Sequence, residues 1–378
     1  MADWLGSLDR LARERAKAGL TRQLRPRPAG DQVVDLAGND YLGLADHPAV
    51  VAAARQALDA YGLGATGSRL VRGSTDAHAA LESALAGWLG AAGALVFSSG
   101  YLANLAVLRA AAAVCDLVVS DAFNHASLID GCKLAGLPVV VAPHNDPAAV
   151  AAILDAHPGR TAAVVTESVF SVDGDLAPLA ELHAVTSARG ALLIVDDAHA
   201  LGLLGPSGAG GVVAAGLAGQ PDVLVTATLS KSLGGAGGVV AGAQPVIRHL
   251  IDTGRTFIYD TAPPPSVVAG VHAAIGVARA AGDRRAILFE RGARIATRLR
   301  AAGFVVTGPA AGVLSVPAPG PEAALAWAAD CRDRGVAVGC FRPPSTPDGS
   351  SRLRLTVNAG VPEADFARAL NVIVECAP

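Results

Sequence analysis

An alternation of short apolar runs with helical stretches constrains the fold of this chain more than any other feature. Continuous apolar runs are typical of strands that are buried on both faces, and helices between them imply parallel neighbours. We therefore predict an α/β fold with a mostly parallel seven-stranded sheet flanked by helices. The seven runs are Ala94–Phe97, Asp116–Ser120, Pro138–Ala142, Ala162–Thr166, Ala191–Val195, Asp222–Ala227 and Gly237–Ala241. The helical stretches include Tyr101–Ala113, Pro147–His157 and Pro178–Arg189.

The segments on either side of this pattern predict three parts of the chain. An amphipathic, Arg-rich helix is expected over residues 3–22 and a short strand over Val33–Ala37. After Pro263–Pro265, an Ala-rich helical region runs to about Ala302, and strands are expected near Val305, Leu314, Val336 and Leu353. We expect an N-terminal helix and arm over residues 1–45, a large domain over 46–275 and a small α+β domain over 276–378.

Composition excludes several classes of protein. A net charge of −3 gives no electrostatic reason to bind nucleic acid or an anionic membrane. No uninterrupted apolar stretch reaches the length of about 18 residues that suggests a membrane span. The five cysteines are scattered without a Cys-x-x-Cys pair, so we expect reduced thiols and no metal site. The first residues show no signal-peptide pattern, and we expect a cytoplasmic enzyme.

Lys231 is the first candidate catalytic residue. The chain has 30 Lys and Arg residues, of which only three are Lys, so a lysine kept in an apolar setting is notable. Lys231 lies in the Gly-rich turn Thr228–Gly235, directly after the apolar run Asp222–Ala227. A desolvated lysine can lose its proton and act as a nucleophilic amine, which arginine cannot do. The alternative is an ordinary surface lysine.

Asp196 makes the catalytic interpretation stronger. The apolar run Ala191–Val195 ends in Asp196-Asp197-Ala198-His199, and a buried carboxylate is costly unless it meets a cation. The protonated ring nitrogen of pyridoxal 5′-phosphate (PLP) is such a cation, and PLP enzymes pair it with a carboxylate and join the cofactor to a lysine. A helix N-cap or a metal-ligand pair would also explain Asp196 alone. Together with Lys231, it predicts PLP as the cofactor.

Two glycine-containing motifs have different interpretations. Gly62–Gly67 spells the G-x-G-x-x-G dinucleotide fingerprint, but it follows a helical stretch, and the fingerprint must follow a strand. We therefore expect a loop that lines the substrate. Phe97–Asn104 follows a strand and opens a helix, so the Gly100 and Tyr101 amides are candidates to bind a phosphate, although a plain N-cap fits equally well.

Three further positions are candidates at the same edge of the sheet. His125 follows a strand end, where its ring could stack on the cofactor or serve a structural role. Ser171 or Ser168 could line the site, although turn chemistry also explains them. Arg352 and Arg354 share one face of a predicted strand, and either could clamp a substrate carboxylate.

These motifs, in this order, resemble the α-oxoamine synthases, a family of PLP-dependent enzymes of fold type I. The resemblance spans nearly the whole chain and rests on Asn39–Leu44, Phe97–Asn104, Asn124–Ser127, Val169–Asp175, Asp196–Gly202, Thr228–Lys231 and Arg342–Thr356. It implies a Schiff base between Lys231 and PLP, with Lys231 then acting as the proton-transferring base. It further implies that Asp196 pairs with the ring nitrogen, His125 stacks on the ring and His199 binds its phenolic oxygen.

The resemblance also implies the remaining site residues. Thr228 would join Gly100 and Tyr101 at the phosphate, with Ser171 nearby. Asn39, Arg354 and Thr356 would hold the amino-acid carboxylate, and Arg22 aligns loosely with an arginine near the acyl chain. Thr261 would reach the phosphate of a partner subunit, which implies a homodimer with shared active sites.

The family joins an amino acid to an acyl thioester, usually with loss of CO2. The segment Phe341–Thr356 is most similar to members that condense L-alanine with a pimeloyl thioester in biotin synthesis. A relative that uses glycine is the alternative within the family. From other classes, an inert PLP-fold binding module and a nicotinamide oxidoreductase remain as weaker alternatives.

Overall fold

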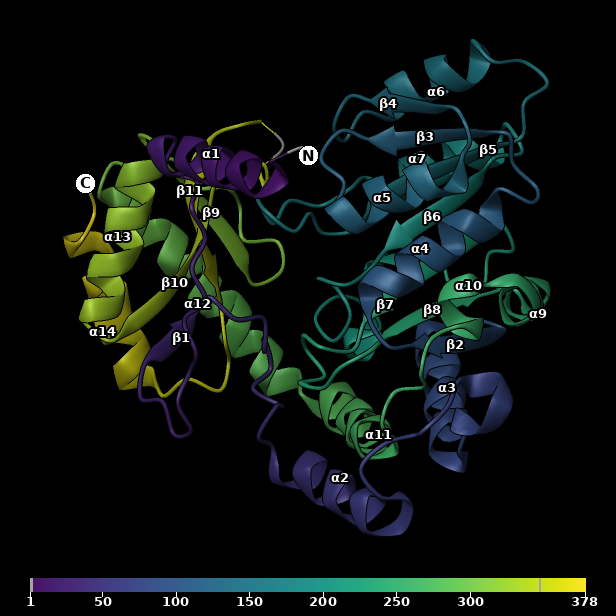
Figure 1. Ribbon diagram of the computed structural model, residues 1–378, viewed down its shortest axis with the longest axis horizontal. Coiled ribbons are helices and arrows are strands. Elements are labelled where there is room, and N and C mark those ends of the chain that lie inside the picture. Colours follow the sequence, from purple (N-terminus) through teal and green to yellow (C-terminus); the bar gives the residue numbers. More distant parts are fainter. Residues whose placement is uncertain (1–2, 347) are drawn as a thin grey trace.

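The large sheet lies in the middle of the chain and has seven strands. The computed structural model describes residues 3–346 and 348–378. The strand order is β2-β8-β7-β6-β5-β3-β4, and β8 alone runs opposite to the other six strands (Figure 1). The predicted mostly parallel, seven-stranded sheet is thus confirmed. Its strands are β2 (Gly93–Phe97), β3 (Leu117–Asp121), β4 (Val139–Ala142), β5 (Ala162–Glu167), β6 (Leu192–Asp196), β7 (Val223–Thr228) and β8 (Gly238–Gly242).

Alternate residues of these strands enter two separate apolar clusters, one on each face of the sheet. One cluster joins Leu95, Val118 and Val165 to helices α4, α5, α9 and α10. The other joins Val96, Val119 and Val164 to α3, α6, α7 and α8. Burial on both faces explains why the sequence shows continuous apolar runs. The helices are α3 (Asp76–Leu89), α4 (Gly100–Ala111), α5 (Ala126–Ala135), α6 (Pro147–Asp155), α7 (Leu179–Ser187), α8 (Gly211–Ala214), α9 (Gln244–Thr253) and α10 (Arg255–Ile258).

A second sheet lies beside the first and combines one strand from the N-terminal part of the chain with three from the C-terminal part. Its order is β1-β10-β11-β9, and the N-terminal strand β1 pairs in parallel with β10. It is built from β1 (Val34–Leu36), β9 (Val313–Ala318), β10 (Val336–Phe341) and β11 (Ser351–Thr356), with α12 (Gly282–Ala301), α13 (Pro321–Asp333) and α14 (Glu363–Glu375). The strand predicted near Val305 is wrong. Residues 304–309 are irregular, because Gly303, Gly308 and Pro309 bound an apolar run too short to pair.

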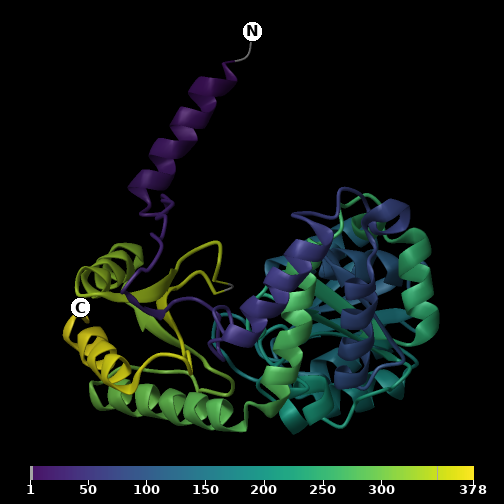
Figure 2. The ribbon, with the colours of Figure 1, turned by 90° about the horizontal axis from the view of Figure 1, so that it is seen from below.

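Helices connect the two sheets and extend the N-terminus. The long helix α11 (Pro265–Ala280) packs along α2 (Pro48–Tyr61), and the chain bends at Ala281 before α12 continues to the small sheet (Figure 1). The predicted N-terminal helix forms as α1 (Trp4–Lys17), shorter than expected, and extends away from the rest of the chain (Figure 2). None of its described residues is buried. No helix within the described residues is long and apolar enough to cross a bilayer.

The Gly62–Gly67 motif lies outside any strand–turn–helix unit. It follows α2 and leads into the single-turn π-helix η1 (Arg69–Gly73). The rejection of a dinucleotide-binding fingerprint is therefore confirmed by its position.

Candidate active site

A cavity of about 250 Å3 opens at the carboxyl edge of the large sheet, where ligands bind in open α/β folds. The cavity is lined by residues at the ends of five strands and in the segments that follow them. Its lining contains most of the predicted cofactor residues. The lining residues are Ser99, Gly100, Tyr101, Asn104, His125, Ser127, Glu167, Asp196, Ala198, His199, Thr228, Ser230 and Lys231.

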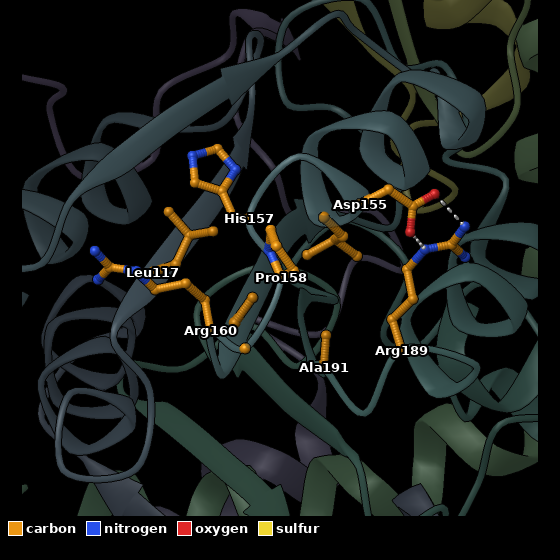
Figure 3. A pocket seen from close by; sticks show the side chains of 10 residues that line it. Leu117, Asp155, His157, Pro158, Arg160, Arg189 and Ala191 are labelled. Atoms are coloured by element: carbon orange, nitrogen blue, oxygen red, sulfur yellow. Dashed lines mark hydrogen bonds and ion pairs between the residues drawn. The ribbon is translucent and has the colours of Figure 1, made fainter.

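A second cavity, of about 230 Å3, lies at the opposite edge of the same sheet (Figure 3). Leu117, Ala162 and Ala191 line it where β3, β5 and β6 begin. Arg189 donates two hydrogen bonds of 2.8 Å to the Asp155 carboxylate at its rim. None of the residues predicted to be catalytic contributes to this cavity, so the carboxyl edge is the candidate site.

Lys231 enters the cavity beyond the end of β7 and contacts His199. The Lys231 Nζ and His199 Nε2 atoms are 2.7 Å apart, and His199 Nδ1 lies 2.6 Å from the Tyr41 hydroxyl. Tyr41 donates in turn to Asn39 Oδ1 at 3.4 Å. Because an ammonium group can only donate, the protonated form of Lys231 donates to His199 Nε2, and the His199 proton then lies on Nδ1, facing the Tyr41 oxygen.

Burial controls the protonation of Lys231, His199 and Tyr41. Desolvation lowers the pKa of Lys231 to about 8, with Asp196 opposing the shift and Arg354 adding to it. Burial and the neighbouring Lys231 and Arg354 charges lower the pKa of His199 well below its usual range. Burial raises the pKa of Tyr41 to about 12. Near neutral pH, Lys231 is therefore an amine that can lose its proton, held by neutral neighbours.

Two carboxyl groups end neighbouring strands beneath Lys231. Asp196 ends β6, and its Oδ1 accepts the Ala198 amide at 2.9 Å. Glu167 ends β5 in register with Asp196, and its two oxygens accept the His125 and Ser171 amides at 2.7 and 3.1 Å. Burial, together with the Asp196 charge, raises the pKa of Glu167 well above its usual range. Glu167 thus positions the backbone of His125 and Ser171, two predicted cofactor residues.

The predicted phosphate site is formed where α4 begins beside β7. Ser99 caps α4, because its hydroxyl accepts the Leu102 amide at 3.2 Å and its carbonyl accepts the Ala103 amide at 3.1 Å. The Gly100 and Tyr101 amides stand at the first helical positions, which have no acceptor within a helix. A Cβ on Gly100 would lie 3.0 Å from the Thr228 Cβ atom, so glycine permits this close approach.

Arg354 joins the predicted carboxylate-binding residues of the small sheet to the loop that follows β5 of the large sheet. Its Nε donates to the Ser171 carbonyl at 2.7 Å, and one terminal nitrogen donates to Asn39 Oδ1 at 3.0 Å and Thr356 Oγ1 at 3.1 Å. Arg352 instead forms ion pairs with Asp173 and Asp348. The structure therefore separates two arginines that the strand pattern left equivalent, and it places Arg354 beside the cavity residues.

A partly buried ion cluster supports the loops behind His125 and Ser171. His144 lies 2.8 Å from both Asp121 and Asp175 through its two ring nitrogens, and its ring stacks on Phe123 at 4.2 Å. Burial opposes protonation, but the two carboxylates outweigh it and raise the pKa of His144 to about 9. His144 is therefore a cation at neutral pH and ties together the loops after β3, β4 and β5.

Two predicted site residues, Thr261 and Arg22, belong neither to the cavity lining nor to the hydrogen-bonded group around Arg354. Thr261 is exposed and pairs with Ser68 through an isolated bridge. Arg22 is exposed on the N-terminal arm and donates to the Ser345 hydroxyl at 3.1 Å. The role of each therefore stays a prediction.

Sequence reasoning missed four residues that the fold brings into the site. They are Tyr41, Asn104, Ser127 and Glu167. Three of them lie inside motifs that already stood out in the sequence, in Asn39–Leu44, Phe97–Asn104 and Asn124–Ser127. Glu167 follows an apolar run, as Asp196 does, and this shared position could have identified it.

The residues present fit PLP. An amine of lowered pKa, a strand-end carboxylate and open helix amides beside a threonine lie in one cavity, as the cofactor's aldehyde, ring nitrogen and phosphate require. Within the described residues, no cluster of three or more His, Cys, Asp or Glu side chains could hold a metal ion.

Comparison with known proteins identifies the family. The family model for class I and II aminotransferases matches residues 31–373. The 8-amino-7-oxononanoate synthases of Mycolicibacterium smegmatis and Mycolicibacterium gilvum are each 50% identical to this chain, over 98% of it and 96% or 97% of their own lengths.

Solved structures agree with this match. Serine palmitoyltransferase from Sphingomonas wittichii superposes with a TM-score of 0.92 at 32% identity, covering 99% of this chain and 98% of that chain. A serine palmitoyltransferase solved with PLP gives a TM-score of 0.91 at 32% identity over the same shares. The 8-amino-7-oxononanoate synthase from Francisella tularensis gives 0.77 at 25% identity, over 91% of this chain and 97% of that chain. The chain belongs to the class I and II aminotransferase family of PLP-dependent enzymes and, within it, to the 8-amino-7-oxononanoate synthases.

Proposed function

We propose that this chain condenses L-alanine with a pimeloyl thioester to give 8-amino-7-oxononanoate and CO2 in biotin synthesis. The observation that carries the proposal is 50% identity to 8-amino-7-oxononanoate synthases over 98% of the chain. The site supports it, because Lys231 and Asp196 line one cavity, and the charge of Arg354 acts on the Lys231 amine.

When bound, PLP supplies an electron sink for the charge that develops on the α-carbon of the amino acid. Asp196 would hold the proton of the ring nitrogen. Lys231 would remove the α-proton, because its pKa of about 8 lets the amine accept and return a proton near neutral pH. The His199 Nε2 lone pair, 2.7 Å from Lys231 Nζ, orients that amine.

Arg354 would hold the carboxylate of alanine. Its Nε and one terminal nitrogen are occupied by Ser171, Asn39 and Thr356, and these bonds direct the remaining terminal nitrogen. A guanidinium fixed in this way binds a carboxylate without first losing side-chain entropy.

Two copies of the chain would share their sites. In this proposal the exposed Thr261 of one subunit reaches the phosphate of the other, so Thr261 lies outside its own cavity. The supporting feature is the exposed apolar surface of the same region, which includes Leu63, Val71 and Tyr259.

The test is a product assay by mass spectrometry with purified enzyme and PLP. L-alanine with pimeloyl-CoA is compared with glycine and acetyl-CoA or succinyl-CoA, and with L-serine and palmitoyl-CoA. We expect 8-amino-7-oxononanoate from the first pair as the main product. The serine arm is included because serine palmitoyltransferases superpose on this chain with a TM-score of 0.92. A main product from glycine or serine would replace the proposal. Lys231→Ala should abolish product formation. Any product that this variant forms from one of the substrate pairs would indicate a non-enzymatic reaction or a contaminating enzyme.

A further inference from the structure

Asn104 connects α4 to α5 and to strands β6 and β7 behind the candidate cofactor site. It lies one turn into α4 and is 2% exposed, although it is polar. Its Nδ2 atom donates to Asp196 Oδ2 at 2.7 Å and to Ser127 Oγ at 2.8 Å. Its Oδ1 atom accepts from the Thr226 hydroxyl at 2.6 Å. All the polar atoms of this side chain therefore have partners.

The partners determine how the amide is oriented. The Asp196 carboxylate can only accept hydrogen bonds, so the nitrogen of Asn104 must face it. The oxygen then faces Thr226, which pairs with Asp196 across β6 and β7 and donates its hydroxyl proton. Flipping the amide would place an oxygen against the carboxylate, so the hydrogen bond to Asp196 would be lost and two acceptors would face each other.

Through Ser127, the side-chain amide of Asn104 also determines which ring nitrogen of His125 carries the proton. Because Ser127 Oγ accepts from Asn104, its own proton is free for His125 Nδ1, 2.7 Å away. The Ser127 amide also donates to this nitrogen at 3.2 Å. A nitrogen that accepts two hydrogen bonds carries no proton, so the His125 ring is neutral and protonated at Nε2.

The structure assigns Asn104 as a positioning residue that holds the Asp196 carboxylate in place and, through Ser127, fixes His125 as the neutral Nε2–H tautomer. This inference rests on the proposed PLP site. Asn104 would then support both Asp196, which ends β6, and His125, which follows β3.

A neutral His125 suits its predicted place against the cofactor ring. An imidazolium there would face a ring whose nitrogen carries a proton, and the two like charges would repel each other in a partly desolvated cavity. Burial lowers the pKa of His125; among the neighbouring charges, Asp196 opposes this shift, whereas Lys231 and Arg354 add to it. The hydrogen bonds from Ser127 disfavour protonation further, because they occupy the Nδ1 lone pair of His125.

The first test measures the tautomer of His125 without cofactor or substrate. Nitrogen-15 NMR of histidine-labelled apoprotein distinguishes a protonated ring nitrogen from an unprotonated one. The chain has nine histidines, and the spectrum of His125→Gln identifies the signal of His125. We expect Nδ1 to be unprotonated and Nε2 to be protonated near neutral pH. A proton on Nδ1 in the wild-type protein would overturn the assignment, whatever the variants do.

The second test separates the contact of Asn104 with Asp196 from its contact with Ser127. Asn104→Leu should disturb the His125 signals and weaken PLP binding by about tenfold to a hundredfold, the usual effect of losing a residue that orients a ligand group. Ser127→Ala should disturb only the His125 signals, because Asn104 still donates to Asp196. Thr186→Val is the matched control, since Thr186 is equally buried in α7 and bonds only the His183 carbonyl.

The outcomes distinguish this inference from the proposed function. If Asn104→Leu keeps wild-type His125 signals and PLP affinity, Asn104 does not position these residues, and the proposed synthase activity is unaffected by that result. If Asn104→Leu does not fold, Ser127→Ala decides, because unchanged His125 signals in that variant contradict the relay. A wild-type protein that takes up no PLP would instead contradict the site itself.

Discussion

The lowered pKa of Lys231 can be measured directly, because this chain contains only three lysines. Lys17 and Lys133 are exposed, whereas Lys231 is half-buried at the base of the cavity. Burial lowers the pKa of Lys231 from 10.5 to about 8. At pH 7.5, about a quarter of Lys231 would then be the neutral amine, against about 0.1% for a lysine of ordinary pKa.

The assay is competitive labelling of the apoprotein with a trace of acetic anhydride at a series of pH values. Mass spectrometry of the three lysine peptides gives the labelling of Lys231 relative to Lys17 and Lys133 in the same tube. Only the neutral amine reacts, so labelling of Lys231 should rise with pH and level off above a midpoint near 8. The exposed lysines correct for the reactivity of the reagent at each pH.

Two substitutions should move this midpoint in opposite directions. Asp196→Asn removes a negative charge that favours the ammonium form, so the pKa of Lys231 should fall further. Arg354→Ala removes a positive charge that disfavours the ammonium form, so the pKa should rise. A wild-type midpoint near 10, or shifts of the same sign in both variants, would refute the reasoning that burial and these two charges set the reactivity of Lys231.

Three further predictions follow from the site. His144 has a folded-state pKa of about 9, above its usual 6.5, so its stabilisation is complete below pH 6.5 and disappears as the pH rises through 9. His144→Gln should therefore lower the free energy of unfolding by about 2 kcal/mol at pH 6, after allowance for solvent screening, and by much less at pH 10, as chemical denaturation can measure. Arg354→Lys should raise the KM for alanine by about tenfold to a hundredfold, since a charged hydrogen bond contributes about 1.5–3 kcal/mol, while PLP affinity stays near wild type. Unchanged KM would remove Arg354 from the carboxylate site. Coexpressed Lys231→Ala and Thr261→Ala chains should form hybrid dimers in which one of the two shared sites is intact, with about half of the wild-type activity per hybrid dimer. Hybrids no more active than the better parent would exclude shared sites.

The pattern of apolar runs was sufficient to predict the large sheet and the edge that carries the site. All seven strands form close to the predicted ranges, because strands buried on both faces must be apolar at every position. Lys231, Asp196, His125 and His199 then meet at one cavity, because each follows the carboxyl end of a parallel strand. The incorrect strand near Val305 shows the limit of this signal, since three apolar residues between glycines do not determine a pairing partner.

The connections between distant segments could be decided only by the tertiary structure. The strand β1 from the N-terminal arm completes the C-terminal sheet, and this brings Asn39 and Tyr41 to Arg354 and His199. Strand alternation placed Arg352 and Arg354 on one face, but only the position of the Asp173 loop shows which of them is already paired.

Side-chain orientation depends on tertiary structure for the same reason. The sequence identified the residue types that PLP chemistry requires, because lysine, aspartate and histidine have chemical properties that do not depend on the fold. Their protonation states and hydrogen-bond partners depend on burial and on neighbours far away in sequence, such as Asn104, 92 positions from Asp196, and Tyr41, 158 positions from His199. The sequence by itself therefore determined the class of chemistry, and the packing of its segments decided which atoms donate, which accept and which carry charge.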